Sequence, residues 1–327
     1  MLRHSMPTRT ETRENAPPQS PASAPSAQHP PSNLVVVLLI ALLCLVWGST
    51  WLVIAGGLRD LPPLTGAATR FVVAALLMSA IAPSLARREG GTKPALGLSL
   101  AVGLLNFAAS YGIVYWGETR LPSGLASILW SVFPMLMAIS GAWFLAGERI
   151  SKRQALGFAI GFAGVALLFA TDLRALSNDA VLTGLVFLLS PIVSCVGTTI
   201  LKKHGKHTSS ALLNRNAMWI GALVLGVLAL SCELPTEARW TLAAAGSVAY
   251  LSIVGTVLTF TLYFWLLRHV AAYRMSMIAY ITPAIALTLG TLVRDEPLTR
   301  FTIAGSATIL AGVVLVVRAP RRRVQAP

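Results

Sequence analysis

Long uncharged apolar runs alternate with short charged breaks along most of the chain. A membrane-spanning helix needs about 20 mainly apolar residues, and ten segments come close to this length. They cover residues 34–57, 64–85, 95–117, 121–146, 154–171, 180–201, 209–232, 240–266, 275–293 and 301–317. The short apolar–polar alternation of barrel strands is absent from the sequence. The pattern therefore predicts an all-α polytopic membrane protein with ten transmembrane helices.

The two ends of the chain differ from this body. Residues 1–33 contain seven prolines and no apolar run, which predicts a disordered tail. Residues 319–327 are short and basic. We expect both tails to be cytoplasmic.

Composition supports the membrane assignment. Of 327 residues, 55% are hydrophobic and 12% are charged, whereas an ordinary soluble domain is about 25% charged. The net charge of +14 raises the question of nucleic-acid binding, which the placement of the charges answers. Eighteen of the 26 Lys and Arg residues fall on the side of the N-terminus, and only six fall on the opposite side. This bias predicts a multi-pass inner-membrane protein with both termini in the cytoplasm and no nucleic-acid partner.

The sequence offers little chemistry for an enzyme or a metal site. The five histidines lie in tails or loops, and the three cysteines share no metal or redox spacing. We therefore expect no catalytic residue, no metal and no cofactor. The acidic residues also avoid the middle of the spans. Glu118 and Glu148, at span ends, are the closest candidates for a proton relay, but they are interpreted as interfacial pair partners. Proton coupling and facilitated transport therefore both stay open.

The sequence repeats itself in register. A shift of 149 residues places Trp47–Thr50 on Val196–Thr199 and pairs Pro134 with Pro283. The two repeats, residues 34–171 and 180–318, contain five spans each. Because five is odd, the second repeat must enter the membrane inverted. Inverted repeats are typical of transporters with a substrate site near the midplane.

The same residues resemble a known family. The run "LCLVWGSTWLVIAGGLRDLPPLTGAATRFVVAALL" is similar to the first two helices of an EamA-type transporter of the drug/metabolite transporter superfamily. The motif Gly-Glu-Arg after the fourth span is also similar, and Asp-Glu-Pro replaces it in the second repeat. The resemblance covers about residues 34–318 and implies ten helices and the export of small metabolites or drugs.

Polar side chains within spans mark candidate contacts with the substrate. One face of the fourth span and its counterpart in the ninth are predicted to form opposite walls of a cavity; these faces contain Ser127, Trp130, Ser131, Pro134, Ser276, Tyr280 and Pro283. The two prolines are candidates for a gating role or a helix bend. The alternative is helix packing through small residues.

Other candidates lie on neighbouring spans. The further substrate-binding candidates are Trp47, Asn106, Ser194, Thr259 and Tyr263. For Asn106, an interhelical hydrogen bond and a substrate contact are equally compatible with the sequence, and Trp47 also suits an interfacial belt. Arg70 and Arg215 lie within spans as possible contacts for an anion or a loop, or else reach toward headgroups.

Together these features predict a secondary transporter that exports small metabolites by alternating access. Amino acids and related amphipathic or aromatic compounds suit the aromatic candidates and the family. A channel-like permease and, more remotely, a membrane-embedded enzyme are the alternatives. The predicted partners are a small-molecule substrate and the lipid bilayer, and the sequence is compatible with a monomer.

Overall fold

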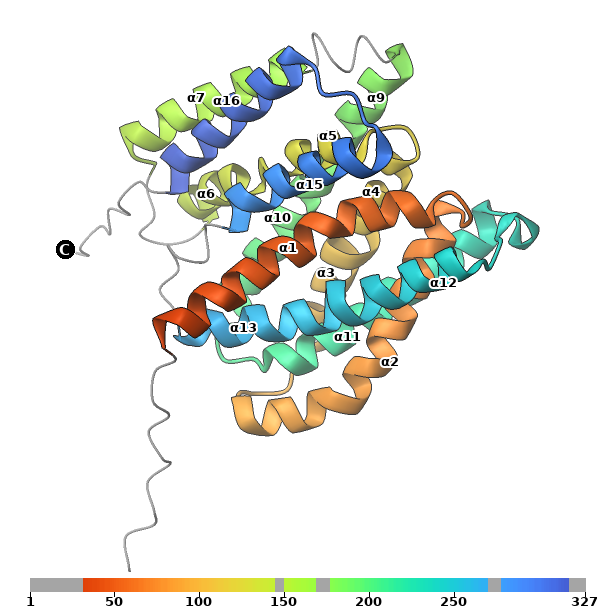
Figure 1. Ribbon diagram of the computed structural model, residues 1–327. Coiled ribbons are helices and arrows are strands. Elements are labelled where there is room, and N and C mark those ends of the chain that lie inside the picture. Colours follow the sequence, from red (N-terminus) through yellow and green to blue (C-terminus); the bar gives the residue numbers. More distant parts are fainter. Residues whose placement is uncertain (1–31, 145–149, 169–176, 270–277, 318–327) are drawn as a thin grey trace, which may run out of the picture. The chain divides into compact units, whose positions relative to one another are not determined.

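A computed structural model describes residues 32–144, 150–168, 177–269 and 278–317 of the chain (Figure 1). Within these ranges the regular elements are helical, apart from an isolated bridge between Thr92 and Thr208. In the first repeat the helices are α1 (Asn33–Gly57), α2 (Pro63–Glu89), α3 (Leu96–Val102), η1 (Gly103–Ala109), α4 (Ser110–Glu118), α5 (Ser123–Trp130), α6 (Phe133–Phe144) and α7 (Lys152–Leu168). In the second they are α9 (Asn178–Phe187), α10 (Leu189–His204), α11 (Ser210–Cys232), η3 (Pro235–Glu237), α12 (Leu242–Ala249), η4 (Tyr250–Leu258), α13 (Thr259–His269), α15 (Ile278–Arg294) and α16 (Arg300–Val317).

Helix boundaries follow local sequence signals. Ser32 begins α1 by accepting a hydrogen bond on its side chain from the backbone N–H of Val35 at 3.3 Å. Pro63 occupies the first position of α2, where its missing N–H costs nothing. Gly90 ends α2 with φ of 72°, which a residue with a side chain rarely adopts. Residues 1–31 and 318–327, which contain almost all of the two predicted tails, lie outside the described residues.

The helices agree with most of the predicted spans. Within the described ranges, seven helical segments, each made of one or more of these helices, are long and apolar enough to cross a membrane. The other predicted spans correspond to α7, α15 and α16, which have 17, 17 and 18 residues. The protein is thus an all-helical polytopic membrane protein, and ten crossings stay a prediction.

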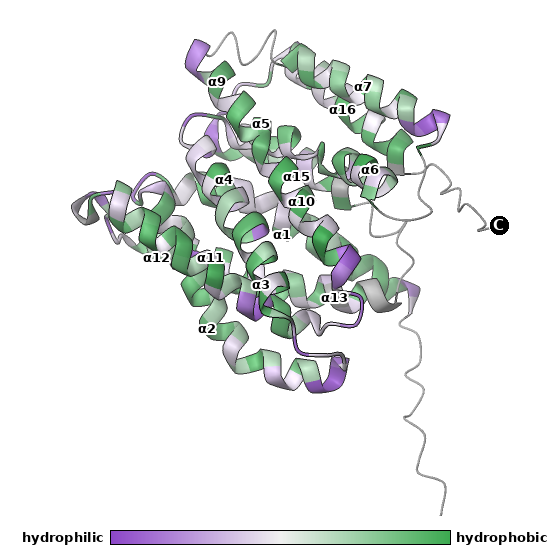
Figure 2. Cartoon of the chain, turned by 180° about the vertical axis from the view of Figure 1, so that it is seen from behind, coloured by the Kyte–Doolittle hydropathy of each residue, from purple (hydrophilic) through white to green (hydrophobic). Residues whose placement is uncertain are grey.

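The surface of the helices is apolar in a way that suits lipid. Leu38 is 58% exposed, Leu223 68% and Leu230 79%. Figure 2 shows apolar residues along the helices and hydrophilic residues mainly at helix ends and in loops. An apolar surface of this extent is unfavourable in water and favourable in a bilayer.

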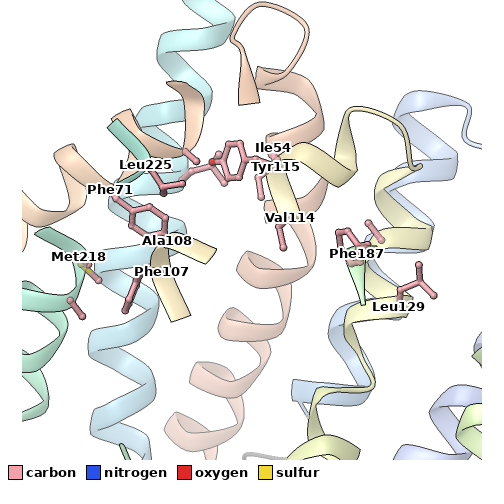
Figure 3. Packing of buried hydrophobic residues seen from close by; sticks show 14 of the residues in the cluster. Ile54, Phe71, Phe107, Ala108, Val114, Tyr115, Leu129, Phe187, Met218 and Leu225 are labelled. Atoms are coloured by element: carbon pink, nitrogen blue, oxygen red, sulfur yellow. The ribbon is translucent and has the colours of Figure 1, made fainter. Parts of the chain in front are cut away.

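The core joins the two repeats. Phe71 of α2 makes edge-on contacts with Phe107 of η1, with ring centroids 5.3 Å apart, and with Tyr111 of α4, at 4.9 Å. Met218 and Leu225 of α11 are fully buried in the same cluster (Figure 3). This part of the core therefore lies between α2, η1 and α4 of one repeat and α11 of the other.

Helices α2 and α11 pack as a pair. A glutamate at the C-terminal end of each helix accepts hydrogen bonds from the N-terminal end of the other. Glu233, just after α11, accepts hydrogen bonds from the backbone N–H groups of Leu64 (2.6 Å) and Thr65 (2.7 Å) of α2. Glu89, at the end of α2, accepts them from Ser210 (2.9 Å) and Ala211 (3.1 Å) of α11. Each carboxylate satisfies free N–H groups and faces the positive end of a helix dipole. We call these two contacts the reciprocal caps.

Helices α7 and α16 pack closely through glycine. A Cβ atom on Gly157 would lie 2.8 Å from the carbonyl oxygen of Gly312, and one on Gly164 would lie 2.8 Å from that of Gly305. With one residue deleted after the paired prolines, the repeat shift becomes 148, which makes Gly157 equivalent to Gly305 and Gly164 equivalent to Gly312. The two contacts therefore exchange partners, as expected for an antiparallel pair of equivalent helices.

Candidate functional site

The two repeats carry the same rare backbone feature at the same place. η1 and η4 are π-helical segments inside the third span of each repeat. The N–H of Ser110 bonds the carbonyl of Leu105, and that of Thr259 bonds the carbonyl of Val254, five residues back in both cases. A shift of 149 residues superposes the two pairs. π-helical turns are uncommon and occur frequently at functional sites, which directs attention to the side chains on η1 and η4.

On η1, Asn106 contacts the opposite repeat. Its amide nitrogen Nδ2 lies 3.1 Å from the carbonyl oxygen of Ser194, 3.2 Å from that residue's Oγ, and 2.9 Å from Oγ1 of Thr198. A Cβ atom on Gly197 would collide with Oδ1 of Asn106. The absent side chain at Gly197 thus allows the amide to approach α10. The expected interhelical hydrogen bond is present, while the described residues provide no hydrogen-bond partner for Oδ1.

One turn further, a second group of polar atoms connects the repeats. The hydroxyl oxygens of Ser110 and Ser190 lie 2.9 Å apart, and the indole N–H of Trp130 donates to Oγ of Ser190 at 3.1 Å. We call the set Asn106, Ser110, Trp130, Ser190, Ser194 and Thr198 the inter-repeat seam. The seam lies about halfway along the segment Leu96–Glu118, so its polar atoms meet deep within the span.

The predicted face on the fourth span is interrupted. Residues Ser131 and Val132 separate α5 from α6, so Ser127, Trp130, Ser131 and Pro134 do not share one continuous helix. Ser127 and Ser131 are buried, and their hydroxyls donate back to the carbonyls of Gly124 (2.8 Å) and Ile128 (2.6 Å). Of these four candidates, Trp130 is the one that belongs to the inter-repeat seam, through its hydrogen bond to Ser190.

The counterparts predicted on the ninth span lie mainly outside the residues that the structure describes. Ser276 lies outside the described residues. Tyr280 belongs to α15, but its side chain lies outside the described part. Pro283 is buried inside α15. Because proline has no backbone N–H, the helix lacks one hydrogen-bond donor at this position. The predicted pairing of the two faces is therefore untested.

Aromatic candidates gather between α1 and α13. Trp47 is half-buried, with its ring centroid 5.4 Å from that of Tyr263 and 6.1 Å from that of Phe260. Thr259 is buried and donates to the carbonyl of Thr256 at 3.3 Å, within its own helical segment. Nearby along α1, Ser49 and Tyr250 share a hydrogen bond of 2.7 Å across the repeats.

The two arginines within spans have different surroundings. Arg70 is 1% exposed, so it does not reach toward headgroups; its Nε donates to Oγ1 of Thr256 on η4 at 3.1 Å. Arg215 is half-buried and bonds Oδ1 of its neighbour Asn216 at 3.1 and 2.8 Å. The 149-residue register leaves Arg215 one turn from the counterpart of Arg70. The reciprocal caps correct that register in this helix pair, because a shift of 145 aligns Thr65 with Ser210 and Arg70 with Arg215.

Tyr111 and the capping glutamates were missed on the sequence, and Glu118 was placed in the wrong environment. Tyr111 lies beneath Arg70, with the guanidinium carbon 4.8 Å from the ring centroid. Glu118 is buried at 6% exposure, so its interpretation as an interfacial pair partner is wrong. The glutamates of the reciprocal caps were also missed, although each follows a long apolar run and its target helix begins near Ser or Thr.

A recess of about 1080 Å³ opens at the end of the bundle that contains the α1–α2 loop. We call this end of the bundle the Asp60 end. Its walls come from that loop, α4, α9 and the segment after α11, and they carry Arg59, Asp60, Glu233 and Arg239 among others. The N–H of Arg239 donates to the carbonyl of Asp60 at 2.8 Å, which ties the two repeats together beside the recess.

Comparison with known proteins identifies the architecture. The model of the EamA-like transporter family matches the chain twice, at residues 34–170 and 182–318. A solved crystal structure of another protein aligns with a TM-score of 0.62 and 15% identity, covering 87% of this chain and 98% of that one. The likeness to the solved structure concerns the fold alone.

Curated relatives cover nearly the whole chain. The uncharacterized transporter YoaV of Bacillus subtilis is 25% identical over 86% of this chain and 96% of its own length. The uncharacterized inner membrane transporter YedA of Escherichia coli is 28% identical over 84% and 88%. A probable amino-acid metabolite efflux pump of Escherichia coli is 27% identical over 85% and 93%. These proteins are transporters, so the alternative of a membrane-embedded enzyme is wrong, and the chain belongs to the EamA-like transporter family.

Proposed function

We propose that this transporter exports small metabolites from the cytoplasm by alternating access. The inter-repeat seam carries the proposal, because polar atoms deep in a span are costly unless they serve packing or a passage. The seam joins η1 of the first repeat to α10 of the second, inverted repeat, and η1 has a π-helical counterpart in η4. A contact between repeats is where a fixed site between rocking halves is expected.

The substrates that suit this site are amino acids or related amphipathic or aromatic compounds. Trp47, Trp130 and Tyr263 offer aromatic surface, and Asn106 offers an amide oxygen without a partner in the described part of the chain. A relative named as a probable amino-acid metabolite efflux pump supports the same class. Tyr280 and Ser276 are proposed as further contacts on the opposite wall, with Pro134 and Pro283 at its bends.

The proposed setting is the inner membrane, with ten helices and both termini in the cytoplasm. The asymmetry of Lys and Arg between the two sides supports the orientation, and a relative named as an inner membrane transporter supports the location. The proposed partners are the substrate and the bilayer, with no nucleic acid.

Flux in proteoliposomes tests this proposal. Purified full-length protein is reconstituted, and the uptake of radiolabelled amino acids and aromatic metabolites is measured with and without unlabelled substrate on the opposite side. A carrier gives saturable uptake that internal substrate accelerates, whereas a channel-like permease gives no acceleration and measurable unitary currents. Asn106→Ala and Tyr280→Ala should each lower uptake while the protein remains folded, and unchanged uptake in both would remove them from the site.

A further inference from the structure

A cluster of buried and half-buried polar side chains lies between the seam and the Asp60 end. It consists of Arg70 on α2 with Tyr111, Tyr115 and Glu118 on α4, and we call it the Arg70 cluster. Tyr115 and Glu118 are three residues apart and thus neighbours on one helix face. The ring of Tyr115 lies 3.3 Å from the position that a Cβ atom on Gly66 would occupy, one turn before Arg70. Figure 3 shows Tyr115 close to Leu225 within the packed core.

The two charged members of the cluster carry polar atoms that have no hydrogen-bond partner in the described chain. Arg70 donates through Nε to Thr256, but its Nη1 has no hydrogen-bond acceptor among the described residues. Glu118 is 6% exposed, and neither of its carboxylate oxygens accepts a hydrogen bond from the described chain. Arg70 and Glu118 influence each other electrostatically without pairing directly. The charged form of a buried group is costly without a partner, so a ligand that supplies the missing partners would stabilise the charged forms of both side chains.

The surrounding charges are already engaged. Glu296 accepts hydrogen bonds from the N–H of Ser123 at 2.8 Å, its hydroxyl at 2.6 Å, and the N–H of Gly124 at 2.9 Å. Arg294 lies 3.8 Å from Oε1 of Glu296. These two residues and Arg70 are the charged groups that act on Glu118. Glu118 is therefore the carboxylate of this region that is left for a cationic group.

We propose that Arg70 and Glu118 form a subsite for a zwitterion, in which Arg70 binds a carboxylate and Glu118 binds an ammonium group of the same ligand. An α-amino acid carries both groups on one carbon, so it supplies the two missing partners together. The two side chains share no hydrogen bond in the described chain, and a direct ion pair between them would leave neither for a ligand. Tyr111 holds the guanidinium through its ring face, at 4.8 Å.

This subsite deepens the proposed function, on which it rests, by naming the groups that select the substrate. It places selection in the half of the bundle next to the Asp60 end, where the recess opens. It also gives α4 two roles, since Ser110 begins this helix at the seam and Glu118 ends it at the subsite.

Equilibrium binding to the full-length protein in nanodiscs tests the assignment. Three probes share one phenyl scaffold: phenylalanine carries both charges, phenethylamine only the ammonium, and 3-phenylpropionate only the carboxylate. The wild-type protein should bind phenylalanine about tenfold or more tightly than either analogue. Glu118→Gln should remove the preference over 3-phenylpropionate, and Arg70→Gln should remove the preference over phenethylamine.

Conservative variants guard against simple misfolding. Glu118→Asp and Arg70→Lys keep the charges and should retain part of each preference, and Glu237→Gln, an exposed change beside the recess, should retain both. Wild-type protein without a preference for phenylalanine, or variants that keep both preferences, would overturn the subsite. If other metabolites still show saturable flux in proteoliposomes, the proposed export function survives that result; absence of flux for the whole panel would remove both.

Discussion

Asn106 shows how one polar side chain holds two repeats together inside a membrane. Its amide nitrogen contacts three acceptors on α10, and glycine at position 197 leaves space for that approach. The sequence identified the residue because an amide in hydrocarbon needs partners. It did not identify Ser194 and Thr198 as those partners, because a one-dimensional pattern does not state which helices touch.

A double-mutant cycle on Asn106→Ala and Thr198→Ala should yield a coupling energy of about 0.5–1.5 kcal/mol. Interhelical hydrogen bonds in membranes fall in this range, since the separated helices find other partners. The measurement is reversible unfolding in mixed micelles. Thr308→Ala is the control, because Thr308 is exposed and donates within its own helix at 2.7 Å. Strictly additive single effects would contradict the contact.

The burial of Glu118 is a property that its local sequence does not predict. Its place at the end of a span suggests an interfacial group, because such ends usually meet water. In the structure α2 and α15 bring Arg70 and Arg294 toward it, and it is buried. Burial here arises from elements distant in sequence, so no local signal at Glu118 announces it.

At the scale of elements, helix ends explain much of the architecture. α2 and α11 are each fixed at their first turn by a glutamate from the other, so the pair is closed at both ends. The sequence predicted both helices within a few residues. The caps themselves depend on the antiparallel packing of α2 against α11, which the hydrophobic pattern does not contain.

Removing one cap should destabilise the helix pair. Glu233→Ala and Glu89→Ala should each lower the free energy of unfolding by about 1–2 kcal/mol, because each leaves N–H groups at a helix start without acceptors. The two effects should add, since the sites lie at opposite ends of long helices. Unfolding in mixed micelles measures both. Glu237→Ala, an exposed change near Glu233, should stay within about 0.5 kcal/mol, and an equal loss in that variant would argue against the caps.

The whole molecule is organised around the contact between repeats. The sequence predicted the repeats, because equivalent residues recur at fixed spacing, and the family match covers both. The register in the α2–α11 pair differs by four residues from the 149-residue register, although the loops before the two helices, residues 58–62 and 205–209, are equal in length. Figure 1 shows α7 and α16 side by side, in line with their glycine contacts.

The orientation of the molecule can be tested with its own cysteines. Cys232 is exposed beside the recess, whereas Cys44 and Cys195 are buried. If both termini are cytoplasmic, a membrane-impermeant maleimide added to spheroplasts should label Cys232. In a Cys232→Ser background, a cysteine introduced at Lys206 should be labelled only after permeabilisation. The reverse pattern would place the termini outside.

The exchanged glycine contacts have a consequence for the origin of the fold. When residue i meets j′ and j meets i′, the interface is self-complementary, as between two copies of one subunit related by a two-fold axis. Gly157 with Gly312 and Gly164 with Gly305 satisfy this rule within a single chain. An ancestral five-helix subunit inserted in both orientations would form the same surface, and gene fusion would then have made a permanent monomer from an antiparallel homodimer.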